Sequence, residues 1–138
     1  EIKGYLKDNE QSNSYQWIIS NPSFETWLFY HYYDEPSALS AGLAMSEHDR
    51  SNWLKEHLNT IIPGGVKSTQ ALYVVERAIE NSKNNYSEHE GFPSVYSTQM
   101  HIVAESILHE MDEEFSQMKK RREEKIEYYK NLGNQEER

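Results

Sequence analysis

Three side chains in this sequence have types and positions suited to holding a metal ion or a phosphate: Glu25, His31 and Lys67. Glu25 follows a short apolar stretch and the turn Ser20-Asn21-Pro22. In open α/β sheets, ligands bind at the carboxyl ends of strands, where such turns lie. Its carboxylate could bind a divalent cation such as Mg2+, which prefers oxygen ligands. The alternative is an acid that interacts favourably with a helix N-terminus.

His31 and Lys67 each allow a chemical and a structural interpretation. His31 lies six positions beyond Glu25, so it points to a somewhat different sector of the same helix. It could be a proton shuttle or a phosphate ligand, or a hydrogen-bonded helix histidine among tyrosines. Lys67 precedes a capped helix start, where anions bind well, and could neutralise a phosphate oxygen. Otherwise it is an exposed loop lysine.

A strand and a helix are predicted to position Glu25 and His31. Residues 17–20 read as the one convincing strand. Asn21 is a good N-cap and Pro22 suits the first helical position, so the sequence predicts a helix from this pair. The helix should pack on the strand through Phe24, Trp27 and Leu28.

The middle of the chain is predicted to alternate between loops and helices. Small residues at 35–46 favour a loop, and Ser46 can cap a helix through Leu58. Ser68 or Thr69 can cap a second helix to about Asn81, followed by a polar loop to Pro93. Residues 1–10 read as the end of a helix that precedes the strand.

A long final helix is predicted to start near Ser97, with Gly133 as its natural stop. Its first half should pack on the helix at 68–81, whereas the charged run 119–125 should leave the body. We therefore expect two parts, a domain at 1–113 and a charged helical extension at 114–138. The extension is a solvated helix with ion pairs, a basic patch for nucleic acid, or a coiled arm for a partner.

Composition limits the function. The 138 residues are 36% hydrophobic with a net charge of −9 and no cysteine. The negative charge argues against broad, non-specific nucleic-acid binding by this part of the protein. Without cysteine there are no disulfides, thiolate metal sites or cysteine nucleophiles. No apolar run is long enough to span a bilayer, so we expect a cytoplasmic protein that does not bind membranes.

Two segments resemble a known family. Ser20-Asn21-Pro22-Ser23-Phe24-Glu25-Thr26-Trp27-Leu28-Phe29-Tyr30-His31-Tyr32 is similar to a signature of RloB-like proteins, with Ser23 where that family usually has Cys. Ser97-Thr98-Gln99-Met100-His101-Ile102-Val103 is similar to a later run of the same family. Lys67 lies where the family tends to carry a basic residue before a helix. The resemblance covers roughly residues 15–110.

The resemblance implies a Toprim-type fold, a metal-dependent nuclease and a role in phage defence or abortive infection with an AAA-type ATPase partner. That fold holds Mg2+ or Mn2+ with a Glu and an Asp-x-Asp motif, and no Asp-x-Asp occurs in this sequence. We therefore expect the C-terminal part of an α/β Toprim-like fold. The visible chain should be mostly α with one or two short strands, and an N-terminal half should be missing from it.

Two functions remain open at this point. The first is part of a nuclease that acts on nucleic acid through the complete protein, with Glu25, His31 and Lys67 at the site and Glu25 on the metal; this chain alone should be inactive and need no cofactor. The second is a non-catalytic helical module for binding or regulation within a defence complex.

Overall fold

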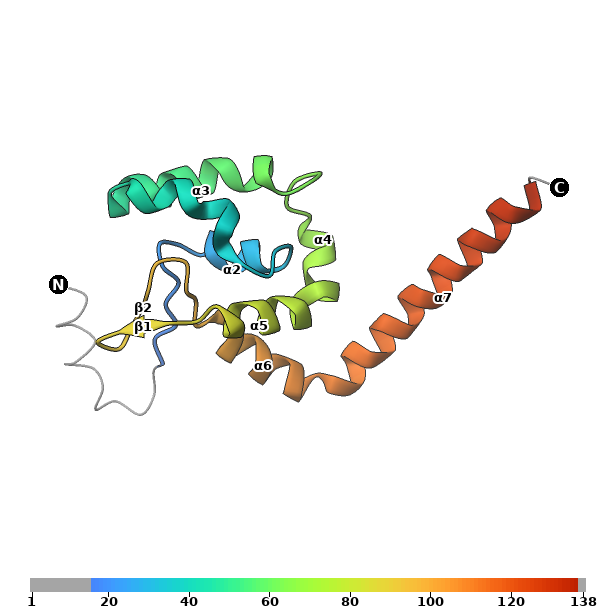
Figure 1. Ribbon diagram of the computed structural model, residues 1–138. Coiled ribbons are helices and arrows are strands. Elements are labelled where there is room, and N and C mark those ends of the chain that lie inside the picture. Colours follow the sequence, from blue (N-terminus) through green and yellow to red (C-terminus); the bar gives the residue numbers. More distant parts are fainter. Residues whose placement is uncertain (1–15, 137–138) are drawn as a thin grey trace. The chain divides into compact units, whose positions relative to one another are not determined.

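The computed structural model describes residues 16–136, with side chains to residue 132. Helices dominate it, with one two-stranded antiparallel sheet and a long last helix (Figure 1), which confirms the predicted, mostly α chain with short strands. The chain divides into two compact units, Glu1–Val103 and Ala104–Arg138. The boundary predicted between residues 113 and 114 stays a prediction, and the helix end predicted within residues 1–10 lies outside the described residues.

The first unit is built around helix α2 (Glu25–Tyr30). Helices α3 (Glu47–Ile61) and α5 (Val75–Asn84) pack against α2 (Figure 1). The other elements are η1 (Pro36–Ala44), α4 (Ser68–Ala71), η2 (Leu72–Val74), β1 (Glu88–His89) and β2 (Phe92–Pro93), and α6 (Met100–Glu110) begins in this unit.

The core of the first unit is aromatic and aliphatic. The ring of Phe29 stacks on the ring of Tyr33, with centroids 4.7 Å apart and planes 11° apart. Aromatic pairs of this kind add stabilisation beyond the area that they bury. The buried cluster consists of Phe29, Tyr30, Leu39, Leu54, Leu58, Ile62 and Tyr96. A large part of the core is therefore supplied by α2 and α3.

Helix α3 confirms the capping prediction. Ser46 is its N-cap, and Ser46 Oγ accepts a hydrogen bond from the Asp49 amide at 3.2 Å. Leu54 and Leu58 are buried, as their helical spacing predicts. The helix continues three residues beyond Leu58, to Ile61.

Helix α5 holds the end of α2 with polar side chains. Arg77, Asn81 and Asn85 lie four residues apart, which places them on one helical face. Arg77 Nη2 donates to the Tyr32 carbonyl at 3.0 Å, and Asn81 Nδ2 donates to the Tyr30 carbonyl at 2.9 Å. Asn85 Nδ2 donates to the carbonyl of Asp34. The Tyr30 carbonyl is one that the end of a helix leaves without a partner, and the Tyr32 and Asp34 carbonyls belong to the segment that follows α2.

The predicted helix at 68–81 is present in outline. The chain is helical from Ser68 to Asn84, with the 3-10 turn η2 in its middle. The predicted cap is wrong, because the N-cap is Lys67 and no side chain caps this end.

Both predicted loops contain regular structure. Residues 36–44 form the 3-10 helix η1, whose carbonyl end at Gly42 accepts a 2.8 Å hydrogen bond from Arg50 Nε. The loop predicted to Pro93 holds the hairpin β1–β2 instead, in register Glu88–Pro93 and His89–Phe92. Its two turn residues, Glu90 and Gly91, have φ of 52° and 78°. Positive φ at both central positions is typical of a two-residue hairpin turn.

The second unit contains the rest of α6 and the helix α7 (Asp112–Glu136). The predicted single helix is thus broken at Met111, and Gly133 does not stop it, because α7 runs on to Glu136. Ile126, Tyr129 and Leu132 are exposed. Packing of the first half of the predicted helix on 68–81 stays a prediction. Among the described residues, no helix is long and apolar enough to cross a membrane.

Candidate functional site

The two segments that carry the family resemblance meet in space. Ser20 and Thr98 form an antiparallel bridge, although 78 positions separate them. The Asn21 amide donates to the Ser97 carbonyl at 2.9 Å, and the Gln99 amide donates to the Ile19 carbonyl at 2.9 Å. We call this pairing of residues 19–21 with residues 96–99 the segment junction.

Side-chain hydroxyls reinforce the segment junction. Ser20 Oγ and Thr98 Oγ1 lie 2.6 Å apart in a hydrogen bond, and the Met100 amide donates to Thr98 Oγ1 at 3.1 Å. Thr98 is fully buried, and Ser97 nearly so. Paired polar groups in such a place fix one geometry, since leaving one without a partner costs free energy. The strand predicted at 17–20 is therefore wrong in extent, because only Ser20 forms a bridge.

Helix α2 begins at Glu25, so the predicted start at Asn21-Pro22 is wrong. The Asn21–Pro22 peptide bond is cis, and the N-cap is Phe24, without a side-chain cap. Asn21 Nδ2 donates instead to the Pro93 carbonyl at 2.9 Å. Trp27 is buried as predicted, whereas Phe24 is 51% exposed and does not pack as predicted.

Glu25 lies in the first turn of α2 and has a polar atom without a hydrogen-bond partner. Its Oε2 atom is buried without a hydrogen-bond partner, and the Oγ atom of Ser23 is in the same state. In native proteins such an atom calls for an explanation, such as an ion, a water or a missing contact. Between residues 16 and 136, no group of three or more acidic or histidine side chains could hold a metal ion. The described residues therefore supply one carboxylate and not a complete metal site.

His31 lies in the interior of the first unit. It is 4% exposed, and its Nδ1 lies 3.0 Å from the Trp27 carbonyl oxygen in a hydrogen bond. Its ring packs edge-on against Trp27, with centroids 4.9 Å apart. Burial lowers the pKa of His31, because a buried site disfavours the charged imidazolium. These contacts are those of a histidine that holds α2 together.

Lys67 is exposed at the start of α4. Its backbone amide donates to the Tyr32 hydroxyl at 3.0 Å, which links the α3–α4 loop to the end of α2. Among residues 16–136, no hydrogen bond or ion pair joins any two of Glu25, His31 and Lys67. The three predicted site residues thus make contacts with different partners and none with one another.

Sequence reasoning missed two of the polar groups that build this region. Tyr30 Oη donates to the Tyr96 carbonyl at 2.7 Å, which ties α2 to the second segment. Asn81 donates to α2 from the other side. Tyr30 lies inside the first signature segment, which assigns it no contact, and Asn81 stands in no recognisable motif. Only the contacts therefore reveal the roles of these two side chains.

Comparison with protein families places both segments within one matched region. The family model of the RloB-like protein matches residues 3–107. The chain belongs to the RloB-like family. Both halves of the segment junction lie inside the matched region of this RloB-like chain, whereas α7 lies outside it. No curated protein and no solved structure matches the chain.

Proposed function

We propose that this RloB-like chain is part of a metal-dependent Toprim-like nuclease that acts in phage defence with an AAA-type ATPase partner. The segment junction is the observation that supports the proposal. It joins the two signature segments directly before Glu25, whose Oε2 atom is buried and has no partner. A buried carboxylate oxygen without a partner is suited to a ligand that the described residues do not include.

In this proposal Glu25 supplies one carboxylate to a Mg2+ or Mn2+ site. The other acidic ligands come from outside the described residues, since those residues hold no group of three candidate ligands. Phosphoryl chemistry with metal ions requires a fixed set of ligands that clamps the attacking and leaving oxygens. One carboxylate cannot provide this set, so the 138-residue chain is inactive alone.

His31 and Lys67 have supporting roles in the same proposal. His31 positions α2 through the Trp27 carbonyl and does not touch the substrate. Lys67 carries an exposed ammonium that can meet a phosphate oxygen of a nucleic acid bound by the complete protein.

The test compares the 138-residue chain with the protein from the complete reading frame, using Mg2+ or Mn2+ and mixed RNA and DNA. We expect cleavage by the complete protein only. Glu25→Gln should lower its rate by at least about 10–100-fold, since even the partners of metal ligands cost this much when they are mutated. Glu47→Gln is the matched control, since Glu47 is also a first-turn helix acid but is exposed. Cleavage by the 138-residue chain, or a folded and fully active Glu25→Gln protein, would contradict the proposal.

A second candidate is a non-catalytic helical module for binding or regulation. The burial of His31 favours it, because that side chain is bonded inside the first unit and not presented to a ligand. In that case neither Glu25→Gln nor Glu47→Gln would change the rate at which the complete protein cleaves nucleic acid. Glu25 would then be a helix-terminus acid.

A further inference from the structure

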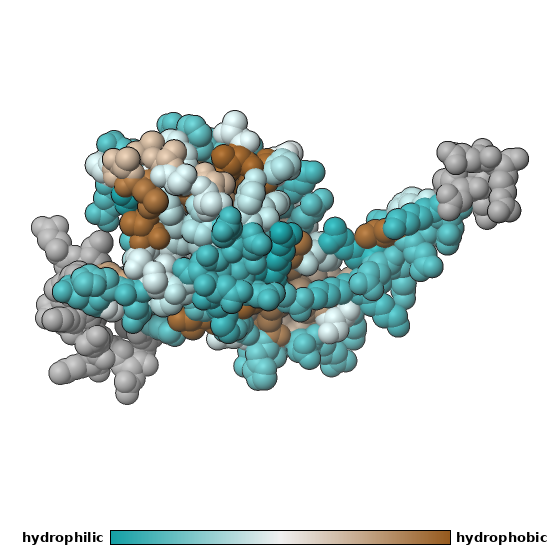
Figure 2. Space-filling view, in the orientation of Figure 1, coloured by the Kyte–Doolittle hydropathy of each residue, from teal (hydrophilic) through white to brown (hydrophobic). Residues whose placement is uncertain are grey.

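Helix α7 carries a row of uncovered apolar side chains. Ile126, Tyr129 and Leu132 are 44%, 60% and 42% exposed. A shallow, open hollow on the same helix is lined by Glu123, Ile126, Glu127, Lys130 and Asn131. In the view by hydropathy, the visible face of α7 is mostly hydrophilic and carries a small apolar patch (Figure 2). Because helices in proteins gain most of their stability by packing an apolar face, this row indicates a partner.

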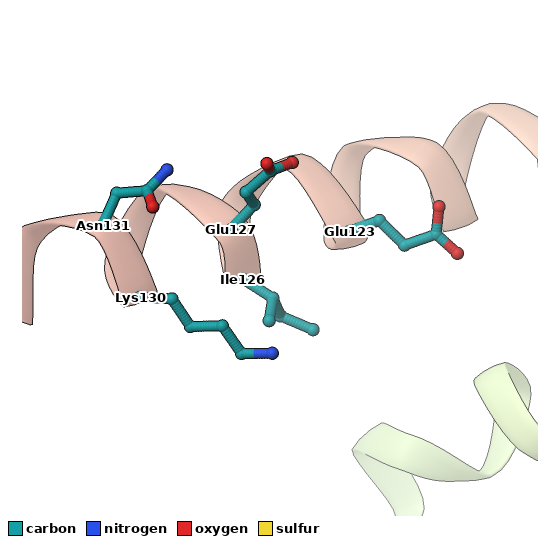
Figure 3. Close-up of a pocket in the computed structure, with 5 residues that line it drawn as sticks. All are labelled: Glu123, Ile126, Glu127, Lys130 and Asn131. Atoms are coloured by element: carbon teal, nitrogen blue, oxygen red, sulfur yellow. The ribbon is translucent and has the colours of Figure 1, made fainter. Parts of the chain in front are cut away.

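Two opposite charges flank Ile126 on the helix. Glu123 precedes it by three residues and Lys130 follows it by four, so all three lie on one side. Figure 3 shows these side chains along the hollow, with Ile126 and Lys130 pointing the same way. Neither Glu123 nor Lys130 has a hydrogen bond or ion pair with another described side chain. Both charges are therefore available to a partner.

We propose that α7 pairs antiparallel with α7 of a second copy of this chain. The two-fold axis passes between Glu127 and Tyr128, so Ile126 faces Tyr129 of the second copy, and the reverse. Leu132 then holds a flanking position, beside the aliphatic part of Lys125 of the second copy. A spacing of three residues is that of the two core positions in a heptad, which face each other in an antiparallel pair.

The charges select this orientation. Glu123 and Lys130 are seven residues apart and hold the same flanking heptad position. In the antiparallel pair, Glu123 of each copy therefore faces Lys130 of the other, which makes two ion pairs. A parallel pair would instead bring Lys125 close to Lys130 of the second copy, which is repulsive. Self-complementary charges of this kind favour a second copy over an unrelated partner.

The pairing should be weak because the contact is short. Stable interfaces bury more than about 1,000 Å2, and a few helical turns bury less. Sedimentation of the 138-residue chain should show a dimer that grows with concentration and weakens with salt.

Charge reversal tests the pairing. Glu123→Lys and Lys130→Glu should each weaken dimerisation by about tenfold, because symmetry makes both ion pairs repulsive. The double variant should restore it, and a mixture of the two single variants should associate better than either one alone. Helix content by circular dichroism should stay unchanged, since these side chains are exposed.

Disulfide trapping tests the register, because the chain has no cysteine of its own. Mild oxidation of a mixture of the Ile126→Cys and Tyr129→Cys variants should give more disulfide-linked dimer than oxidation of either variant alone. A chain that is monomeric at every concentration, or a double variant that is not restored, would overturn the proposal and leave the row to a different protein. Neither outcome bears on the proposed nuclease, which does not depend on α7.

Discussion

Asn81 provides the sharpest test of how α2 is held. The side chain is 6% exposed, and its Nδ2 donates to the carbonyls of Tyr30 and Tyr33, both at 2.9 Å. The Asn81→Ala variant keeps a good helix former in α5 but removes both donors. The carbonyl at the end of α2 and the Tyr33 carbonyl, three residues further along the chain, then lose these partners.

The expected cost follows from the two lost hydrogen bonds. A buried polar group left without its partner costs about 1–3 kcal/mol. Because two carbonyls lose their partner and one of them is deeply buried, Asn81→Ala should lower the free energy of unfolding by about 2–4 kcal/mol. Asn84→Ala is the matched control, because Asn84 is an exposed residue of the same helix. It corrects for the gain in helix propensity, roughly 0.5 kcal/mol.

Urea unfolding of both variants, followed by far-ultraviolet circular dichroism, measures the difference. The reasoning predicts a large shift in midpoint for Asn81→Ala and almost none for Asn84→Ala. Equal midpoints for the two variants would refute the claim that Asn81 fastens α2 to α5.

Two further perturbations probe the same unit. A Cβ atom at Gly42 would lie 2.1 Å from the Tyr96 hydroxyl, so Gly42→Ala should lower the free energy of unfolding by about 1–3 kcal/mol. Tyr96→Phe should recover part of that loss in the double variant, and a loss of equal size in both backgrounds would argue against the clash. The pKa of His31 is lowered from 6.5, so the unfolded chain takes up its proton first as pH falls. The free energy of unfolding should therefore drop as pH falls below about 6.5, and the drop between pH 7 and pH 5 should be smaller for His31→Gln. An equal drop in the wild-type protein and the variant would contradict a lowered pKa of His31.

Local signals predicted structure where no distant group competed with them. Ser46 and the spacing of Leu54 and Leu58 agree on one helix, and α3 follows that pattern. At Asn21 the local cap signal failed because the side chain is bonded to Pro93, 72 positions away. Its carbonyl also accepts the Tyr96 amide at 2.8 Å. A sequence pattern cannot display such long-range competition.

The two segments that form the segment junction could be found from the sequence, but their contact could not. The family resemblance picked out both segments, and the structure joins them at Ser20 and Thr98. The resemblance could not show that the His31 side chain points into the interior. The spacing of His31 from Glu25 fits a side chain that points inward and one that points to the surface. The partnerless Oε2 atom of Glu25 also depends on tertiary packing, which spacing alone does not encode.

Mn2+ binding by the complete protein tests the central proposal most directly. If Glu25 supplies a carboxylate to the metal site, Glu25→Gln should weaken the calorimetric affinity for Mn2+ by at least about tenfold, while Glu47→Gln leaves it unchanged. An equal affinity for Mn2+ in the wild-type protein and a folded Glu25→Gln variant would contradict the account.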